Sequence, residues 1–400
     1  MTPLIPVAEA LDTLLSNAPP PPHSELRPLH AACGAVLAAD VVADIAVPPE
    51  DNSAMDGYAL RTVDTPGPLP VSQRIAAGQA PQPLLPGTAA RIFTGAPVPP
   101  GADTVVMQEQ CTEVNGALEV RGEVRAGDNI RLRGQDIVAG ACLLARGRRL
   151  RAEDLGLLAS TGVGQVAVRR ALRVALLATG DELVEPGSGP LQPGQIYNSN
   201  RFMLAALLRS LGMEVVDCGQ VADTPVATAD ALLEAAGSAD CVLSTGGVSV
   251  GDEDHVRSQV ERLGSLALWR LAIKPGKPLA FGEVGGVPFL GLPGNPTSSF
   301  VTFCLLARPF LLRFQGVDDV EPLWLRARAG FTRDKADRRE EYLRVTLSSG
   351  ESGMRVVPFA NQSSGVLSSV CYSNALARIP AATTVAESDW LDVALLDSLN

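Results

Sequence analysis

The feature that most constrains the fold is an alternation of apolar strands and helices between residues 172 and 316. Residues 173–178 form a continuous apolar run, which is typical of a strand buried on both faces of a sheet. Other strands are expected at 213–216, 241–244, 266–273 and 288–292, and helices at 200–211, 227–236, 254–263 and 296–314. This spacing predicts a doubly wound, mostly parallel α/β sheet whose ligand lies at the carboxyl ends of the strands.

The chain on the N-terminal side of this region divides into two kinds of sequence. Residues 1–43 and 138–171 are expected to form a helical linking domain, with helical spacing at 7–15 and 151–160 and an alanine-rich apolar stretch at 29–39. Residues 44–137 are dense in Pro and Gly with short Val and Ile runs, which predicts a small β-rich domain. If 151–160 packs back on the N-terminal helices, the β-rich domain is an insertion.

The C-terminal region, residues 317–400, predicts a further β domain. Residues 342–347 and 354–357 are the strands that its pattern indicates most clearly. With the α/β region at 172–316, the chain is therefore expected to have several domains, as its 400 residues also suggest.

Composition excludes some classes of protein. The formal net charge of −11 argues against a nucleic-acid-binding protein, although a local basic pocket can still bind an anion. Seven cysteines without a CxxC pair, mostly in apolar runs, predict reduced and buried thiols of a cytoplasmic protein. The first residues have no basic region followed by an apolar core, and no apolar stretch approaches the ~20 residues of a membrane span. We expect neither a signal peptide nor a membrane segment.

The first loop that can carry chemistry follows the strand at 173–178. Its sequence, Thr179 to Leu183, contains Gly180, which allows a sharp turn, and then two carboxylates, Asp181 and Glu182. These carboxylates are either solvated turn residues or part of a site at the strand end.

The second loop, residues 244–255, is rich in small residues. Gly246, Gly247 and Ser249 can expose backbone N–H groups and a hydroxyl to a phosphate group. The loop has neither the Walker spacing nor GxGxxG. The acids at 252–254 either favour the start of the next helix or include a ligand of a divalent cation, for which Asp254 is a candidate.

The third loop is basic. Lys274 and Lys277 each directly precede a proline, with Arg270 shortly before them, and rigid backbone that holds cations at a strand end suits an anion pocket. In the following Pro293–Asn295 segment, Asn295 is also a good helix N-cap. Together, the three loops predict a phosphorylated ligand with a divalent metal ion.

Several longer motifs resemble one protein family. Residues 51–59 (DNSAMDGYA), 93–106 (FTGAPVPPGADTVV) and 131–137 (RLRGQDI), followed in order by the loops above, closely resemble the molybdopterin molybdenumtransferases. These are the MoeA-type proteins, whose eukaryotic relative is the E domain of gephyrin. The resemblance implies a helical linking domain, an inserted β-rich domain, a molybdopterin-binding α/β domain and a C-terminal β-barrel-like domain.

The same resemblance implies a homodimer whose active site lies between the α/β domain of one subunit and the inserted domain of the other. It implies insertion of molybdate into adenylyl-molybdopterin with release of AMP, Mg²⁺ as cofactor, and contacts with a molybdopterin adenylyltransferase and other cofactor-biosynthesis proteins. The implied catalytic residues are Asp56, Thr94, Asp136, Glu182, Asp223 and Asp254, with Glu182 and Asp254 as metal ligands. The implied substrate-binding residues are Gly246, Gly247, Ser249, Arg270, Lys274, Lys277, Pro293, Asn295, Arg344 and Ser364.

Two other functions remain open at this point. One is a molybdopterin adenylyltransferase, which shares the α/β domain and a comparable glycine loop but lacks the inserted domain. The other is a scaffold or anchoring module of the gephyrin type, in which the polar loops would not be used for catalysis.

Overall fold

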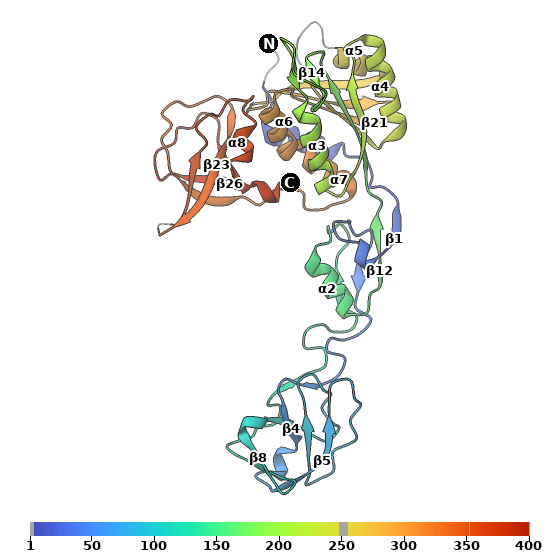
Figure 1. Ribbon diagram of the computed structural model, residues 1–400, viewed down its shortest axis with the longest axis vertical. Helices are drawn as coiled ribbons and strands as arrows, with labels where there is room; N and C mark the ends of the chain where they lie inside the picture. Colours follow the sequence, from blue (N-terminus) through green and yellow to red (C-terminus); the bar gives the residue numbers. More distant parts are fainter. Residues whose placement is uncertain (1–3, 248–254, 352, 400) are drawn as a thin grey trace.

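The computed structural model describes residues 4–247, 255–351 and 353–399. Figure 1 shows an elongated molecule with a small β-rich domain at one end and the α/β and C-terminal domains together at the other. A narrow segment of paired strands with helix α2 (Ala152–Ser160) joins the two ends. None of the helices in the described ranges is long and apolar enough to cross a bilayer.

The α/β domain is built on a mixed sheet whose first strands are parallel. In spatial order the strands are β16 (Glu214–Val221), β13 (Arg173–Thr179), β17 (Cys241–Thr245), β21 (Val287–Leu292), β20 (Pro278–Val284) and β18 (Gly264–Arg270). The pairings from β16 to β21 are parallel, whereas β20 and β18 are antiparallel. The predicted sheet is confirmed, with an antiparallel edge added to its parallel part.

Strand β20 is not predicted by the sequence pattern, because Pro278 and Gly282 belong to residue types that strands disfavour. Both are acceptable at their positions. Pro278 is the first residue of the strand, and a Cβ on Gly282 would overlap the carbonyl oxygen of Ser265 on β18. The close approach of two strands, which local sequence does not encode, therefore explains this glycine.

Helices cover both faces of the sheet, as a doubly wound fold requires. They are α3 (Ser199–Ser210), α4 (Pro225–Ser238), α5 (His255–Leu263), α6 (Pro296–Thr302), a π-helical turn (Phe303–Ala307) and α7 (Arg308–Gln315). The central strand β13 places Val174 and Leu176 in the core that includes α3 and α7, and Ala175 and Leu177 in the core that includes α4 and α5. Its continuous apolar run thus serves two cores.

The predicted helices of this domain are confirmed. The long helix expected at 296–314 is continuous but contains the π-helical turn just before Pro309. Proline has no N–H to donate to the carbonyl four residues earlier, and a wider turn accommodates this loss. The N-terminal helix α1 (Val7–Ser16) is also confirmed, and its Ala10 and Leu14 are buried in the core that includes α7.

The linking segment contains more strand than its sequence suggests. Strand β1 (Ser24–Pro28) pairs with β12 (Gln165–Arg169), and β2 (Val41–Val42) pairs with β11 (Cys142–Leu144). The helical prediction for residues 29–39 is wrong, because only the 3-10 turn η1 (Leu29–Ala31) forms there. The N–H of Leu37 donates instead to the carbonyl of Arg148. Pairing with residues about a hundred positions away overrides local helix propensity.

Helix α2 packs back onto this N-terminal segment, as the insertion hypothesis requires. Leu158 of α2 is buried in one cluster with Ala32, Leu37 and Val168. The chain therefore leaves the linking segment after β2, forms the β-rich domain, and returns at β11. The exact domain boundaries remain predictions.

We expect that replacing Asp154 with asparagine will destabilise the linking segment. The buried Asp154 carboxylate accepts hydrogen bonds from the Arg148 guanidinium at 2.7 and 3.1 Å and from the Arg151 N–H at 2.9 Å. Burial alone would raise the pKa of Asp154, but these bonds outweigh it and hold that pKa below the ordinary value. The free energy of unfolding should fall by about 1–3 kcal/mol near neutral pH.

The pH dependence tests the cause. Because the folded-state pKa is depressed, the contribution of Asp154 is present above the unfolded-state pKa and is lost as pH falls through the folded value. Thermal unfolding of the wild type and Asp154→Asn should therefore differ at about pH 7, and the difference should shrink as the pH falls through the folded-state pKa of Asp154. An unchanged difference at acid pH would contradict this explanation.

The inserted domain is a β structure, as predicted. Its sheet has the order β7 (Thr104–Met107), β4 (Gly57–Leu60), β6 (Ala89–Ile92), β5 (Leu69–Ile75), β9 (Ala117–Val120) and β8 (Cys111–Val114). A separate short ladder is formed by β3 (Asn52–Ser53), which precedes the strands of this sheet in the chain, and β10 (Ile130–Arg131), which follows them. Two 3-10 turns complete the domain, η2 (Thr62–Asp64) and η3 (Gln108–Gln110).

The C-terminal domain is a closed barrel. Strands β23 (Glu340–Gly350), β24 (Gly353–Pro358), β22 (Leu325–Ala329), β26 (Trp390–Leu395) and β25 (Ala375–Ile379) are neighbours in this order, and β25 also pairs with β23. Helix α8 (Ser368–Cys371) and the 3-10 turn η5 (Leu396–Ser398) flank it. Strand β19 (Ile273–Lys274), which belongs by sequence to the α/β region, pairs with β23 and joins the two domains.

The cysteines are free thiols, but the expectation that most are buried is wrong. Cys241 and Cys304 are buried, Cys111 and Cys218 are intermediate, and three are exposed: Cys33, Cys142 and Cys371. An apolar neighbour in sequence does not ensure burial, because short paired strands such as β11 are covered on only part of their surface.

Candidate functional site

A cleft of about 890 Å³ lies between the α/β domain and the C-terminal barrel. The loops after β13, β17 and β21 meet there, as expected for the carboxyl ends of neighbouring parallel strands. The basic loop around 274–278 and the C-terminal segment 362–365 close the other sides. The short ladder of β14 (Leu183–Val184) and β15 (Ile196–Tyr197) forms part of the rim.

The cleft brings together many of the residues that the sequence indicates. Those that line it are Glu182, Gly246, Lys274, Lys277, Pro293, Asn295 and Ser364. Two other candidates, Ser249 and Asp254, lie outside the described residues. Seven further candidates are described but do not line it: Gly247, Asp223, Arg270, Arg344, Asp56, Thr94 and Asp136.

The floor of the cleft depends on close backbone approach. Gly246 has a positive φ, and a Cβ there would come within 2.8 Å of the Thr179 carbonyl oxygen. A Cβ on Gly247 would clash with Val256 of α5, so this glycine supports the loop although it does not line the cleft. Small residues are therefore needed for packing as well as for ligand access.

Polar side chains of the floor are residues that sequence reasoning missed. The Asn200 amide donates to Thr245 Oγ1 at 2.8 Å and to the Gly294 carbonyl at 2.7 Å, which ties together the loops after β17 and β21. Three buried polar atoms in the lining have no hydrogen-bond partner among the described residues: Thr179 Oγ1, Asn198 Nδ2 and Asn200 Oδ1. Buried polar atoms normally have partners, so these three atoms keep hydrogen-bonding capacity beneath the cleft surface that the described residues do not use.

Asn198 could have been noticed because two asparagines flank Ser199 directly after a predicted loop. Its side chain caps α3 by accepting from the Arg201 N–H, which is the ordinary role of an asparagine there. The amide nitrogen remains buried and without a partner in the described structure. One side chain thus serves the helix and the cleft.

Lys274 is held by carboxylates of the C-terminal domain. Its Nζ lies 3.1 Å from Glu341 Oε1 and 3.8 Å from Asp337 Oδ2, because β19 pairs with β23 in a register that sets Lys274 opposite Glu341. Glu341 is buried and also pairs with Arg333. Burial, and then the charge of Arg333, lower the pKa of Lys274 below its ordinary value.

Arg339 is a second residue that sequence reasoning missed. It lines the cleft, and its guanidinium donates to Asp337. Among the described lining residues, Lys274, Lys277 and Arg339 are cations, whereas Glu182 is the carboxylate. A protein of net charge −11 therefore presents a locally positive cleft, which suits an anionic ligand. Arg339 lies in an Arg-rich stretch, 338–339, which is the signal that could have indicated it.

Arg344 lies behind the cleft rather than on it. It is 1% exposed, and its guanidinium donates to Ser369 Oγ and to the Tyr342 carbonyl. Burial lowers its pKa to about 10. Its backbone exchanges two hydrogen bonds with the Gln362 side chain, which does line the cleft. Arg344 therefore supports the cleft wall, and direct contact with a substrate is not what its position favours.

Arg270 and Asp223 lie beside the cleft. Arg270 ends β18, where it is paired with Pro278 and its carbonyl accepts from the Ile5 N–H. Asp223 follows β16, and its N–H donates to the Asp181 carboxylate at 3.3 Å. The roles assigned to both residues remain predictions.

Asp56 and Thr94 form a compact pair in the inserted domain. The Asp56 carboxylate accepts from both the backbone N–H and the hydroxyl of Thr94, each at 2.8 Å. These two hydrogen bonds, the backbone one first, lower the pKa of Asp56. Asp136 is exposed in the same domain. Figure 1 places this domain at the end of the molecule opposite to the α/β domain, so these residues cannot reach the cleft of their own chain.

Gly57, next to Asp56, should tolerate no side chain. A Cβ at Gly57 of β4 would overlap the Val106 carbonyl of β7, which is backbone and cannot rotate away. We expect Gly57→Ala to destabilise the inserted domain by about 1–3 kcal/mol or more. Gly156→Ala is the matched control, because Gly156 has no positive φ and no atom within 4 Å of its Cβ position. Limited proteolysis should cut the inserted domain faster only in Gly57→Ala; equal rates would contradict the expected clash.

Three family models together match most of the chain. Residues 5–162 match the model of the MoeA N-terminal region, described as domains I and II. Residues 175–313 match a probable molybdopterin binding domain, and residues 326–396 match the MoeA C-terminal region, domain IV. The cleft described above thus lies between segments that match the second and third of these models.

Individual relatives agree with these matches. The chain is 42% identical over 312 residues to a molybdopterin molybdenumtransferase of Haemophilus influenzae, covering 77% of each chain. It is 38% identical over 380 residues to one from Nostoc sp., covering 91% of this chain and 87% of the relative. A crystal structure of a molybdopterin biosynthesis MoeA protein from Pyrococcus horikoshii superposes with a TM-score of 0.80 at 32% identity, over 98% of this chain and 99% of that one. The chain therefore belongs to the MoeA family of molybdopterin molybdenumtransferases.

Proposed function

We propose that this protein inserts molybdate into adenylyl-molybdopterin, with release of AMP. The observation that carries the proposal is the positive cleft at the strand ends of a domain that matches a molybdopterin-binding model. The name of the relatives supports the reaction. They are not named adenylyltransferases, so that alternative is not adopted, and a purely anchoring role leaves the unpaired polar floor of the cleft without a purpose.

Molybdate is a tetrahedral dianion and needs cations and hydroxyl or amide donors around it. Lys274 and Ser364 both line the cleft and are candidates for this contact. Arg339 is a better third candidate than Arg270, because Arg339 lines the cleft and Arg270 does not. A guanidinium offers a planar fork that matches two oxygens of an oxyanion.

The glycine loop and the floor suit the organic part of the substrate. Gly246 and Pro293 leave room near the backbone, and Asn295 and Lys277 stand at the same edge. The unpaired atoms of Thr179, Asn198 and Asn200 lie beneath this surface, and they would exchange hydrogen bonds with the polar edge of a pterin if its binding shifts the lining. Binding there would hold the phosphates near the basic loop.

Magnesium fits the chemistry of the cleft if the substrate phosphates supply part of its coordination shell. No group of three or more His, Cys, Asp or Glu side chains suited to a metal occurs among the described residues. Mg²⁺, however, commonly takes only one or two protein carboxylates and completes its shell with water and phosphate oxygens. Glu182 would hold the ion, with Asp254 as the other predicted ligand. When bound, Mg²⁺ would compensate the charge of the pyrophosphate group.

We also propose a homodimer with a shared site. Asp56, Thr94 and Asp136 belong to the inserted domain, which lies at one end of the elongated chain, whereas the α/β and C-terminal domains that form the cleft lie at the other end. An antiparallel pair of such chains would bring each inserted domain to the cleft of its partner. Asp56 would then present its carboxylate, already ordered by Thr94, to the substrate.

The test is a reaction of purified protein with adenylyl-molybdopterin, molybdate and Mg²⁺, scored by AMP release and by reconstitution of an apo-molybdoenzyme. Glu182→Ala should abolish insertion and leave the fold and the assembly intact. Chelation of Mg²⁺ should likewise lower the insertion activity of the wild type. Asp181→Asn is the control, because Asp181 is the adjacent carboxylate but does not line the cleft. Pyrophosphate formed from molybdopterin and ATP, without AMP release in the first assay, would instead show an adenylyltransferase.

A further inference from the structure

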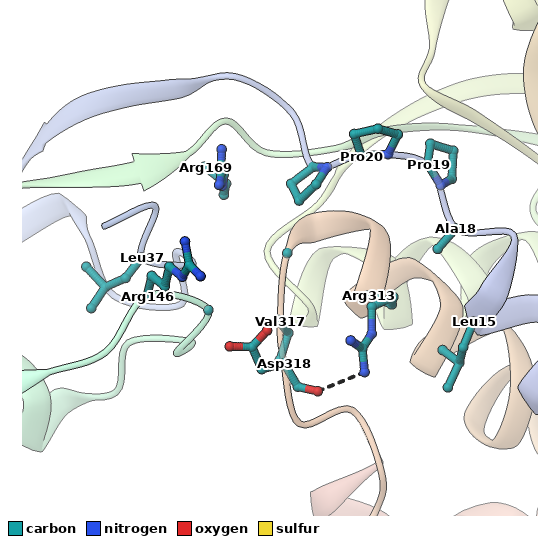
Figure 2. A pocket seen from close by; sticks show the side chains of 13 residues that line it. Leu15, Ala18, Pro19, Pro20, Leu37, Arg146, Arg169, Arg313, Val317 and Asp318 are labelled. Carbon is teal, nitrogen blue, oxygen red and sulfur yellow. Dashed lines mark hydrogen bonds between the residues drawn. The ribbon is translucent and has the colours of Figure 1, made fainter. Parts of the chain in front are cut away.

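A second cavity, of about 460 Å³, lies where the α/β domain meets the linking segment. Figure 2 shows Arg146 and Arg169 on the linking side and Arg313 on the side of α7. The cavity is separate from the cleft described above and shares no lining residue with it. Neither the proposed reaction nor the candidate residues of the cleft make use of it.

The cavity carries an excess of positive charge. Within the described ranges, none of its three arginines forms an ion pair within 4 Å: Arg169 donates to the Pro22 carbonyl at 3.2 Å, and Arg313 donates to the Asp318 carbonyl at 2.9 Å. The Arg313 Nε is buried and lacks a hydrogen-bond partner there. Asp318 is the carboxylate in the described lining. In a protein of net charge −11, guanidinium groups would ordinarily form ion pairs with carboxylates.

The Asp318 carboxylate is turned against the backbone of the linking segment. A Cβ on Gly147 would overlap its oxygens, so the carboxylate lies directly over the Gly147 Cα. The Asp318 N–H also donates to the Gly147 carbonyl at 3.4 Å. The position of Asp318 is thus set by the contact between the domains, and the arginines are left to face the cavity.

The remaining walls are apolar and rigid. Leu15, Val317 and the run of prolines at 19–21 belong to this lining, and Figure 2 shows Pro19 and Pro20 on the stretch of chain between Ala18 and the linking segment. Prolines have a fixed φ and lose little entropy when a ligand packs on them. The cavity therefore combines several cationic groups with a preformed apolar surface, which is the usual composition of a small-molecule site.

We propose that this cavity binds a small organic phosphate monoester. The phosphate would be held by the guanidinium groups of Arg146, Arg169 and Arg313, and the organic part would pack on the proline wall. A carboxylate presents one edge to one guanidinium fork, whereas a phosphate has several oxygens and can meet forks from different directions. A ligand held from both sides would fix the angle between the α/β domain and the segment that carries the inserted domain.

The probe is AMP, a phosphate monoester with a flat, rigid organic part. Isothermal titration calorimetry at low salt should show that AMP binds more tightly than inorganic phosphate and that adenosine does not bind. Arg146→Gln and Arg313→Gln should each weaken AMP binding by about tenfold, the usual effect of losing one charge-assisted contact. Arg121→Gln, at an exposed arginine of the inserted domain, should bind AMP as the wild type does.

Hydrogen–deuterium exchange separates this cavity from the cleft. AMP at the proposed site should slow exchange in peptides that cover residues 145–149 and 313–318, and the effect should persist in Lys274→Ala. Protection confined to the basic loop at 274–278 would assign AMP to the cleft and overturn the proposal. Equal binding by adenosine and AMP would overturn it too. So would unchanged AMP affinity in Arg146→Gln, a variant expected to fold normally because the Arg146 side chain is exposed.

Discussion

Replacing Lys274 with alanine is expected to lower the rate of molybdate insertion by about 100-fold or more, which is typical for removal of one preorganised charged donor. Lys274 lines the cleft, and its ammonium is held at 3.1 Å from Glu341. The variant should remain folded, because the lysine is partly exposed and fills no core. The measurement is AMP release under single-turnover conditions.

Lys335 provides the matched control for this substitution. It is an exposed lysine of the neighbouring domain and does not line the cleft. Lys335→Ala should insert molybdate at the wild-type rate. If Lys274→Ala and Lys335→Ala behaved alike, the basic loop would have no role in the reaction.

The pH profile gives a second reading of Lys274. Because burial and Arg333 lower its pKa, the ammonium is lost earlier on the alkaline side than an ordinary lysine. The insertion rate should therefore fall at high pH. In Lys274→Arg the fall should begin at a higher pH, because arginine stays charged. The same alkaline limb in both proteins would assign the titration to another group.

Replacing Glu341 with alanine is expected to have a large effect on the stability of the C-terminal domain. This carboxylate is 4% exposed and faces both Lys274 and Arg333. Breaking a fully buried pair costs about 3–5 kcal/mol, and the loss here should be about 2–3 kcal/mol because both cations keep contact with water. Unfolding in urea can be followed by the fluorescence of Trp324 and Trp390, which lie in the same part of the chain.

An exposed ion pair of the same domain is the control for Glu341. Glu387 contacts Arg355 at 2.7 Å, and both side chains are more than half exposed. Glu387→Ala should change the free energy of unfolding by less than about 1 kcal/mol. A similarly small change in Glu341→Ala would show that burial of this carboxylate contributes little. Insertion activity should fall only in Glu341→Ala, because only that variant releases Lys274.

Strand β13 was predictable from its continuous apolar run, and helices α3, α4 and α7 from the helical spacing of their own apolar residues. The loops with Glu182, Gly246 and Lys274 were predictable as a site because parallel strands end at the same edge of a sheet. Local pattern and general topology were sufficient for these features.

Other features depend on residues that are distant in the chain. The segment 29–39 looks helical by itself, but several of its N–H groups donate to carbonyls between residues 148 and 167, so it forms no α-helix. Arg339 reaches the cleft only because the C-terminal domain meets the α/β domain, and Asn200 reaches it because α3 packs beside the loops after β17 and β21. Arg344 looks like a surface cation by composition, yet the barrel buries it behind Gln362.

The sequence by itself determined the α/β core, the order of the domains and the strand-end loops, because these depend on periodicity and on short motifs. Only the tertiary structure decided that Lys274 pairs across domains with Glu341, and that three arginines share a cavity beside α7. The physical reason is range. Hydrophobic period and turn chemistry act between near neighbours, whereas charge, burial and close backbone contact are set by whatever segment folds alongside.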